Sequence, residues 1–564
     1  MQSLSHQIPS VGIQPHGHMT GQEVVDSYPG SEDENNIEMS TYEPFTELVQ
    51  NQEPEWITGL PLGILMVALS IVMFLVLLDG SIIGTATPQI TSEFHSLGDV
   101  GWYGSAFQLA SAVVQPLTGK IYATLNKKWS YLWFFTIFEV GSLVCGIANS
   151  SAMLIIGRAV AGIGVAGLQN GSLTIIATAA PLLKRARLNG ILMGLSQSGI
   201  VMGPLIGGAF TSYSTWRWCF YINLPLGAFV AGMLLFVHIP EPKKHVEIGQ
   251  SRALTLIKDV DFLGFILLTG FAIELLLALQ IGGASRPWNS PIVIGLLCGS
   301  VVTLIVFLFW QHYMGDKAMI PFSIVTQRVV WCGCLVYAFL MAALFLLSYY
   351  IPIYFQSVLD ASAIMSGVYT LPNILAQVIA CVGSGILVER MGYYLPWSIA
   401  STVMTAISTG LISTFDVNTT TGQWIGYQLL FGAGCGIGIQ MPILAAQSSL
   451  AAPSIPFAIA ILIFSQNMVS AICLAIASSL FTNSLQTLIP QYAPSVDPAA
   501  VIDAGATGIR RVVQAGPVLD QVLAAYSRAI GNTFYIATAS LAAGLFFVWG
   551  MGWRDIRIQR GSAQ

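Results

Sequence analysis

Long apolar segments separated by short polar ones dominate this chain from about residue 60 to residue 553. A helix that crosses a bilayer needs about 20 mostly apolar residues, and fourteen segments reach that length. They lie near 60–83, 101–122, 129–148, 152–176, 188–211, 217–239, 261–281, 291–312, 331–355, 364–388, 396–414, 424–446, 456–481 and 534–553. The segments group along the chain as six, two and six. The pattern therefore predicts an all-α membrane protein with fourteen transmembrane helices.

This grouping predicts two six-helix bundles, at 56–240 and 331–553, joined by a linker at 241–330 that carries two extra transmembrane helices. Residues 1–55 contain ten Asp or Glu and no Lys or Arg, and they show no apolar period. We predict that they form a disordered, acidic cytoplasmic tail, which lacks the features of a cleaved signal peptide. Residues 554–564 are predicted to form a short cytoplasmic tail.

Composition supports lipid as the solvent, because 54% of the residues are hydrophobic and only 9% are charged. A soluble domain carries about 25% charged residues. Of the Lys and Arg residues, sixteen fall in segments on one side of the predicted membrane and five on the other, with Arg158 inside a span. The bias of Lys and Arg towards the cytoplasm then places both termini inside.

The same topology puts two glycosylation sequons outside, at Asn418 and at Asn149, the second of them in a short loop. The longest outer segment, about 482–533, contains the sequence VLDQVLAAYSRAIG. We expect this stretch to form an amphipathic helix that lies at the membrane interface.

Several kinds of site are disfavoured by the sequence. The eight cysteines lie in or beside apolar runs and form no CxxC pair, which favours small core residues over disulfides or a metal site. The sequence contains no G-x-x-x-x-G-K-[ST] phosphate loop and no cluster of metal ligands, so we expect neither ATP-driven transport nor an enzyme. We expect no cofactor, no bound metal and no nucleic-acid partner.

One predicted helix contains unusually weak helix formers. The stretch LSQSGIVMGPLIGGAF, residues 195–210, includes four glycines and a proline. Gly199, Gly203 and Gly207 recur every four residues and therefore share one helix face, where a neighbouring helix can approach closely. Pro204 removes a backbone hydrogen bond and can bend the helix there. Tight packing alone, or a bent helix that seals a pathway between helices, would both explain this pattern.

Three further stretches stand out: LDGSIIGTATPQI (78–90), GRAVAGIGVAG (157–167) and WRWCFYINLP (216–225). The glycine-rich helix adds a spaced set of residues: Gly190, Gly199, Gly203, Pro204, Gly207 and Gly208. These motifs resemble those of the major facilitator superfamily, in its branch of fourteen-helix drug–proton antiporters, and within that branch the fungal toxin and multidrug efflux pumps. The three stretches resemble the motifs of helices one, four and six, and the spaced set matches the antiporter signature of helix five. The resemblance implies the major facilitator fold: two six-helix bundles plus two extra central helices.

A loop signature of the superfamily occurs in both halves of the chain and implies cytoplasmic gating. Its matching residues are Gly119, Lys127 and Lys128 in the first copy and Gly385, Glu389, Arg390 and Gly392 in the second. The first copy has Ala123 where the family usually has an aspartate that holds the halves together. That role either passes to Lys127 and Lys128, passes to the second copy, or is weakened.

The resemblance also implies proton coupling, for which we identify Asp79, Arg158 and Glu139 as candidates. A charge inside a bilayer is costly and usually faces a cavity or a partner. Asp79 is either a proton-coupling carboxylate or a helix-end residue that reaches interfacial water. Arg158 either tunes a nearby acid or extends to the interface, and Glu139 is either a proton site or a structural acid. Glu274 lies on an extra helix and is predicted to be structural or adjacent to lipid.

The sequence therefore predicts proton-coupled efflux of a small, largely apolar organic compound, such as a toxin, secondary metabolite or drug. Uptake by proton symport is the first alternative, and a membrane sensor that transports nothing is the second. The expected partners are the small-molecule substrate, protons and membrane lipid, and the protein is expected to be monomeric. We expect it in the plasma membrane, with a vacuolar or vesicular membrane as the alternative.

Overall fold

The computed structural model describes residues 56–96, 99–240, 261–283, 286–513 and 515–557. The predicted acidic tail and the linker residues 241–260 lie outside this part of the chain. Within the described ranges the regular structure is helical, and two isolated β-bridges are the only pairing of extended residues. Thirteen helices in these ranges are long and apolar enough to cross a membrane. The predicted all-α membrane fold is confirmed.

The N-terminal helices pack around α1 and α4. Their bounds are α1 Leu60–Phe94, α2 Val100–Thr124, α3 Lys127–Gly146, α4 Ser151–Ala179, α5 Leu182–Tyr213, α6 Trp218–Tyr221 and α7 Asn223–Phe236. Helix α1 packs along α5, and α4 packs along both α2 and α3. The α2 helix is not among the thirteen candidate spans, yet it corresponds to the predicted span at 101–122 and packs beside α4.

The C-terminal helices form a second group. Their bounds are α12 Arg328–Ser357, α13 Ala363–Tyr369, α14 Leu371–Met391, α15 Leu395–Ile412, α16 Thr421–Gly438, α17 Met441–Ser449, α18 Ile455–Tyr492, α19 Pro498–Val512 and α20 Pro517–Val548. Helix α12 packs against α18 and α20, and α16 packs against α14 and α15. The two groups meet mainly where α5 contacts α14 and where α2 contacts α18.

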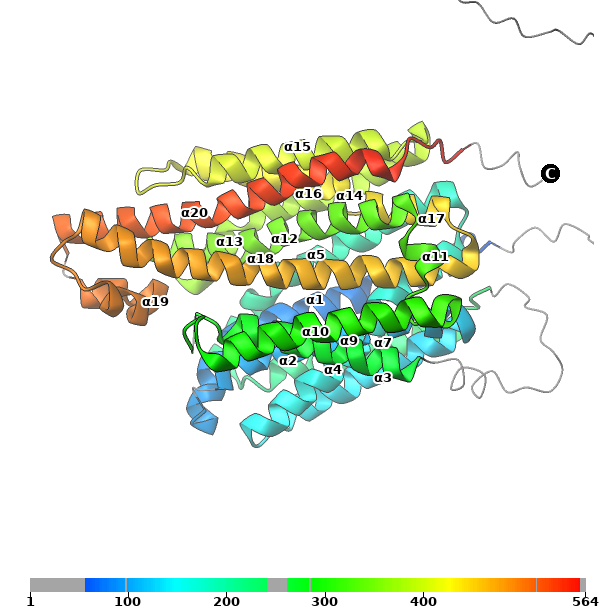
Figure 1. Cartoon of the computed structure of the whole chain (residues 1–564), viewed down its shortest axis with the longest axis horizontal. Helices are drawn as coiled ribbons and strands as arrows, with labels where there is room; N and C mark the ends of the chain where they lie inside the picture. Colours follow the sequence, from blue (N-terminus) through cyan, green and yellow to red (C-terminus); the bar gives the residue numbers. More distant parts are fainter. Residues whose placement is uncertain (1–55, 97–98, 241–260, 284–285, 514, 558–564) are drawn as a thin grey trace, which may run out of the picture. The chain divides into compact units, whose positions relative to one another are not determined.

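The two extra helices, α9 (Phe262–Ile281) and α10 (Pro291–Met314), pack against each other, and α9 also contacts α2 and α18 (Figure 1). The buried carboxylate of Asp261, which caps α9, accepts hydrogen bonds from Gly264 N at 2.7 Å, Trp310 Nε1 at 2.7 Å and Gln311 Nε2 at 2.8 Å. Glu274 accepts a hydrogen bond from Thr303 at 3.1 Å. Both acids therefore join α9 to α10, which supports a structural role for Glu274.

Helix α1 extends beyond its predicted end at residue 83 and continues to Phe94. Its outer segment is too polar to read as a membrane span, but threonine hydroxyls satisfy backbone carbonyls along it: Thr87 bonds Ile83 O at 2.8 Å and Thr91 bonds Thr87 O at 3.0 Å. The longer helix places Asp79 fifteen residues before its end. Asp79 was expected close to the helix end, and that expectation is wrong.

The prediction of an interfacial amphipathic helix at VLDQVLAAYSRAIG is also wrong. These residues form the beginning of α20, which continues without interruption to Val548. Most of their apolar side chains are buried, including Val522, Leu523 and Ile530, and Ser527 donates a hydrogen bond to Phe415 O at 2.8 Å. The polar residues of the stretch resemble those of a surface helix, but tertiary packing makes it part of the last long helix.

Candidate functional site

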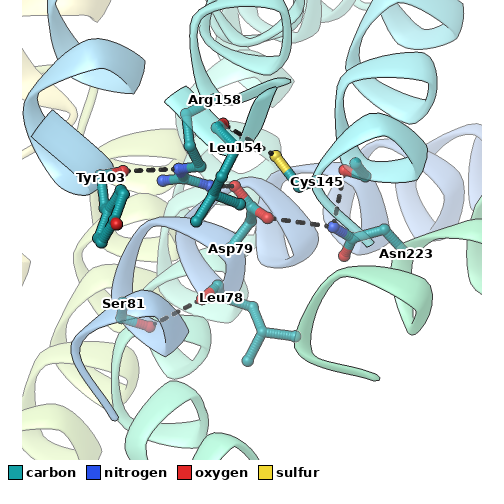
Figure 2. A network of polar contacts seen from close by, with 9 residues as sticks. Leu78, Asp79, Ser81, Tyr103, Cys145, Leu154, Arg158 and Asn223 are labelled. Carbon is teal, nitrogen blue, oxygen red and sulfur yellow. Dashed lines mark hydrogen bonds and ion pairs between the residues drawn. The ribbon is translucent and has the colours of Figure 1, made fainter. Parts of the chain in front are cut away.

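A buried ion pair joins α1 to α4. Nη1 of Arg158 lies 2.5 Å from Oδ2 of Asp79, and the two side chains are 1% and 0% exposed (Figure 2). Arg158 also donates from Nε to Tyr103 O on α2 at 2.9 Å, and its guanidinium lies 4.2 Å from the Phe107 ring centroid. The structure thus brings together two residues that the sequence identified separately. Neither side chain reaches the surface, so the alternatives that placed them in interfacial water do not hold.

Asn223, the first residue of α7, extends this polar network. Its amide donates to Asp79 Oδ1 at 3.3 Å and to Ser142 Oγ on α3 at 3.0 Å (Figure 2). The network therefore connects α1, α2, α3, α4 and α7 inside the N-terminal group. Within the described residues, Nη2 of Arg158 has no acceptor. Sequence reasoning missed Asn223, although it stands in the quoted WRWCFYINLP motif and is a rare polar residue at the start of an apolar helix.

Glu139 lies on α3, three residues before Ser142 and on the side of that helix that faces α7. Both of its carboxylate oxygens are buried, and neither has a hydrogen-bond partner among the residues that the structure describes. A Cβ added at Gly227 of α7 would overlap Oε1 and would lie 2.6 Å from the carboxyl carbon. The glycine therefore provides the space that the Glu139 carboxyl group occupies.

The glycines of the helix-five signature face two different neighbours. A Cβ at Gly199 would lie 2.5 Å from Phe74 O, and those at Gly203 and Gly207 would also collide with α1. A Cβ at Gly190 would instead lie 2.6 Å from Cys381 O on α14, across the boundary between the two halves. At Gly208 the nearest atom is Ile364 Cγ1 at 3.9 Å, an ordinary contact. The predicted shared face of three glycines is confirmed, and its neighbour is α1.

Pro204 lies inside α5, which continues as one helix from Leu182 to Tyr213. The proline stands directly after Gly203, so its missing N–H falls within the segment that packs against α1. This part of α5 is therefore held by close contact with its neighbour as well as by its own hydrogen bonds.

The second copy of the loop signature makes contacts between the halves. Glu389 of α14 lies 3.4 Å from Arg187 Nε of α5 in a partly exposed ion pair. A Cβ at Gly385 would lie 2.6 Å from Ala186 O, so α14 and α5 approach closely there. In the first copy, a Cβ at Gly119 of α2 would lie 3.0 Å from Phe457 Cα of α18. Both glycines therefore lie where helices of opposite halves approach each other.

Among the remaining residues of the loop signature, Lys128 holds local structure. Lys128 donates to Leu235 O at 2.8 Å and to Val237 O at 2.9 Å, so it binds the end of α7 within its own half. Of the three alternatives for the missing aspartate, these contacts count against Lys128 and the Glu389 ion pair favours the second copy. Lys127 begins α3, and Arg390 is exposed at the end of α14.

Gly392 caps α14 with φ +82° and accepts a hydrogen bond from Ile556 N at 2.9 Å. It therefore binds the segment that follows α20. In that segment, hydrogen bonds from Arg557 lower the pKa of Asp555 to about 2, so this pair keeps its charges at neutral pH.

A buried polar contact between the halves was missed by the sequence analysis. Asn189 of α5 donates to Gln447 Oε1 of α17 at 3.2 Å, and Gln447 donates to Leu173 O of α4 at 3.4 Å. Arg185, also buried, donates to Gln447 O at 3.5 Å and to Ala180 O at 3.0 Å. We call Arg185, Asn189 and Gln447 the inter-half polar contact. These side chains follow no recognised motif, and only the packing of α5 against α17 brings them together.

The remaining candidate sites are simple to place. Asn418 and Asn149 are both exposed, in the loops before α16 and α4. All eight cysteines are free, and seven of them are buried. Within the described ranges, no group of three or more His, Cys, Asp or Glu residues is placed to hold a metal ion.

Comparison with known proteins decides the family. Residues 69–472 match the Major Facilitator Superfamily. This chain belongs to that superfamily. The transporter is 53% identical to the MFS-type transporter pigP of Monascus ruber, over 89% of this chain and 88% of the relative. It is 48% identical to the efflux pump mokI of Monascus pilosus, over 88% of this chain and 92% of the relative. It is 39% identical to the efflux pump aflT of Aspergillus parasiticus, over 89% of this chain and 98% of the relative.

Solved structures show the same fold at low sequence identity. The human organic anion transporter MFSD10 aligns with a TM-score of 0.58 and 12% identity, over 87% of this chain and all of the other. The proton:xylose symporter XylE aligns with a TM-score of 0.56 and 13% identity, over 86% of this chain and 95% of the symporter chain. These two structures show the fold alone. The superfamily match and the curated relatives show that the chain is a multi-pass membrane transporter of small molecules and not an enzyme.

Proposed function

We propose that this transporter exports a small, largely apolar organic compound, such as a toxin, secondary metabolite or drug, in exchange for protons. The efflux pumps mokI and aflT are similar to it over most of the chain, which supports the direction of transport. The observation that carries the coupling mechanism is the buried Asp79–Arg158 ion pair. The α5 glycine signature is consistent with exchange for protons, because that signature is associated with antiport in the family.

The ion pair couples protonation to helix packing. Arg158 stays charged over the whole accessible pH range, so the charge of the network changes only when an acid gains or loses a proton. Protonation of Asp79 would leave a buried guanidinium unbalanced, and removing one partner of a buried pair costs about 3–5 kcal/mol. A conformation that changes the surroundings of this pair therefore changes the proton affinity of the acids in the network. Alternating access driven by a proton gradient requires such a change.

The proposed cycle releases ligand outside from the protonated carrier and binds the next ligand after a proton is lost to the cytoplasm. Each charge that crosses the membrane gains about 2.3 kcal/mol per 100 mV. The close approach of Gly190 on α5 to α14 and the inter-half polar contact lie where the halves would change their contacts during this cycle. We place the protein in the plasma membrane as a monomer surrounded by lipid, with its termini inside and Asn418 outside.

Dye efflux from living cells tests this function. Cells of a yeast strain deleted for its own drug pumps are loaded with rhodamine 6G, and the dye left inside is followed after energisation with glucose. We expect faster efflux in cells that express the transporter than in cells with an empty vector, and no difference after a protonophore is added. Equal dye retention in both strains, over a panel that also includes neutral apolar dyes, would contradict the proposal.

A further inference from the structure

The carboxyl group of Glu139 is enclosed between α3 and α7 without a polar partner. Both oxygens are buried and unpaired among the described residues, and Gly227 leaves the space that they fill. A structural acid inside a membrane is normally satisfied by a donor, as Glu274 is by Thr303 at 3.1 Å. The surroundings of Glu139 supply the volume for a carboxyl group and none of the hydrogen bonds that would stabilise a carboxylate.

Glu139 also belongs to the same buried region as the ion pair. We call the region formed by Asp79, Arg158, Glu139, Ser142 and Asn223 the seam. Asn223, four residues before Gly227 on α7, bonds Ser142, three residues after Glu139 on α3, and the same amide bonds Asp79. Residues three and four apart lie one above the other on a helix. Glu139 therefore lies one helical turn from the contact between Asn223 and Asp79.

The titratable groups around this seam are few. The helices packed against α3 are α2, α4, α6 and α7. Helix α7 carries no titratable side chain, α4 carries only Arg158, and α6 carries Cys219 and Tyr221. On α2, Tyr103 hydrogen-bonds Ser151 at 3.0 Å, Lys120 donates to Lys317 O at 3.0 Å, and Tyr122 donates to Gly167 O at 2.9 Å. On α3 itself, Cys145 donates to Leu154 O at 3.8 Å and Tyr131 hydrogen-bonds Ser172 at 3.0 Å. Lys127 and Lys128 stand in the first turn of α3, about three helical turns before Glu139.

The seam therefore holds one permanent cation and two acids. Asp79 at 2.5 Å balances Arg158, and a second carboxylate would add an unbalanced charge to a buried region. One proton on Glu139 makes the trio of Asp79, Arg158 and Glu139 neutral. Resting on the proposed proton-coupled function, we propose that Glu139 is protonated in this conformation and carries the exchanged proton, while Asp79 stays ionised opposite Arg158. When water reaches the seam, the Glu139 O–H bond breaks and the proton passes to water.

Infrared difference spectroscopy of the purified full-length protein in lipid nanodiscs tests the first part. A protonated carboxyl group without hydrogen bonds absorbs at a higher frequency than a hydrogen-bonded one, and its band shifts in D2O. We expect such a band in the parent protein, its loss in Glu139→Gln, and its retention in Asp79→Asn. Glu274→Gln is the matched control, because it removes a membrane glutamate that has a hydrogen-bond donor. A band that persists in Glu139→Gln would overturn the proposal.

Transport of rhodamine 6G in proteoliposomes tests the second part. Glu139→Gln is expected to exchange dye for dye at the parental rate and to lose accumulation driven by a pH gradient. Glu139→Asp keeps a titratable group, so it should recover part of that accumulation. Gradient-driven accumulation by Glu139→Gln at the parental level would overturn the assignment. If the parent itself shows no gradient-driven accumulation, the proposed function fails, whereas the infrared result still reports whether Glu139 is protonated.

Discussion

The contact of α5 with α1 gives a prediction that the structure makes quantitative. In Gly203→Ala, the new methyl group would overlap Ser81 Oγ and lie 2.8 Å from Ser81 Cβ and 2.9 Å from Ile82 N. The hydroxyl can rotate away only by losing its 3.1 Å hydrogen bond to Gly199 O. The backbone nitrogen cannot rotate, so α5 and α1 must separate by about 0.5 Å, the difference between 2.9 Å and an ordinary 3.4 Å contact.

This separation should reduce stability by a measurable amount. Overpacking costs about 1–3 kcal/mol and a lost hydrogen bond about 1 kcal/mol, so Gly203→Ala is expected to lower the free energy of unfolding by about 2–4 kcal/mol. Gly208→Ala is the matched control, since its nearest neighbour is 3.9 Å away. Replacing glycine by alanine inside a helix should there increase the free energy of unfolding by about 0.5–1 kcal/mol.

SDS titration of the purified protein in mixed micelles, followed by circular dichroism, measures both variants. The two substitutions should change the unfolding free energy with opposite sign. Adding Ser81→Ala to Gly203→Ala should cost less than the sum of the two single substitutions, because it removes the overlapping hydroxyl. Equal stabilities of Gly203→Ala and Gly208→Ala would refute the inference that α1 and α5 are in close contact at Gly203.

Three further predictions follow from the contacts described above. Asp79→Ala and Arg158→Ala should each lower the unfolding free energy by about 3–5 kcal/mol, and the double variant should cost less than their sum in the same titration; strictly additive losses would argue against the pair. Gln447→Ala breaks the buried inter-half polar contact, so it should increase several-fold the maleimide labelling of Cys381, which lies at the boundary between the halves. Arg187→Gln removes a partly exposed pair worth about 0–1 kcal/mol and should change that labelling little, and the reverse order would contradict this assignment. Asn418→Gln should abolish a mobility shift on glycosidase treatment and Asn149→Gln should leave it unchanged, because the sequon hydroxyl of Ser151 already bonds Asp99 and Tyr103.

Hydrophobic length predicted the membrane helices well, since every predicted span corresponds to one helix or to two consecutive helices. The C-terminal end of α1 and the N-terminal start of α20 were predicted wrongly for one physical reason. Threonine hydroxyls in α1 and buried contacts in α20 satisfy polar groups that, in the sequence, resemble interfacial or loop residues. Local composition therefore placed the membrane-spanning segments but not the points at which the helices stop.

The candidate site was predicted in its parts and not in its connections. Asp79, Arg158 and Glu139 could be found because ionisable residues are rare in apolar segments. Their pairing depends on which helices are neighbours, and a one-dimensional pattern does not contain that information. Asn223 and Gln447 were missed for the same reason, because an amide in a long apolar chain acquires a role only when its partner helix is known.

Coupled dye and proton movement in inside-out vesicles is the most direct test of the central claim. In these vesicles the lumen corresponds to the outside of the cell. With an acidic lumen, rhodamine 6G should accumulate inside while a trapped pH dye reports that protons leave, and reversing the gradient should reverse both fluxes. Movement of dye and protons in the same direction, or dye movement unaffected by the gradient, would contradict proton-coupled export.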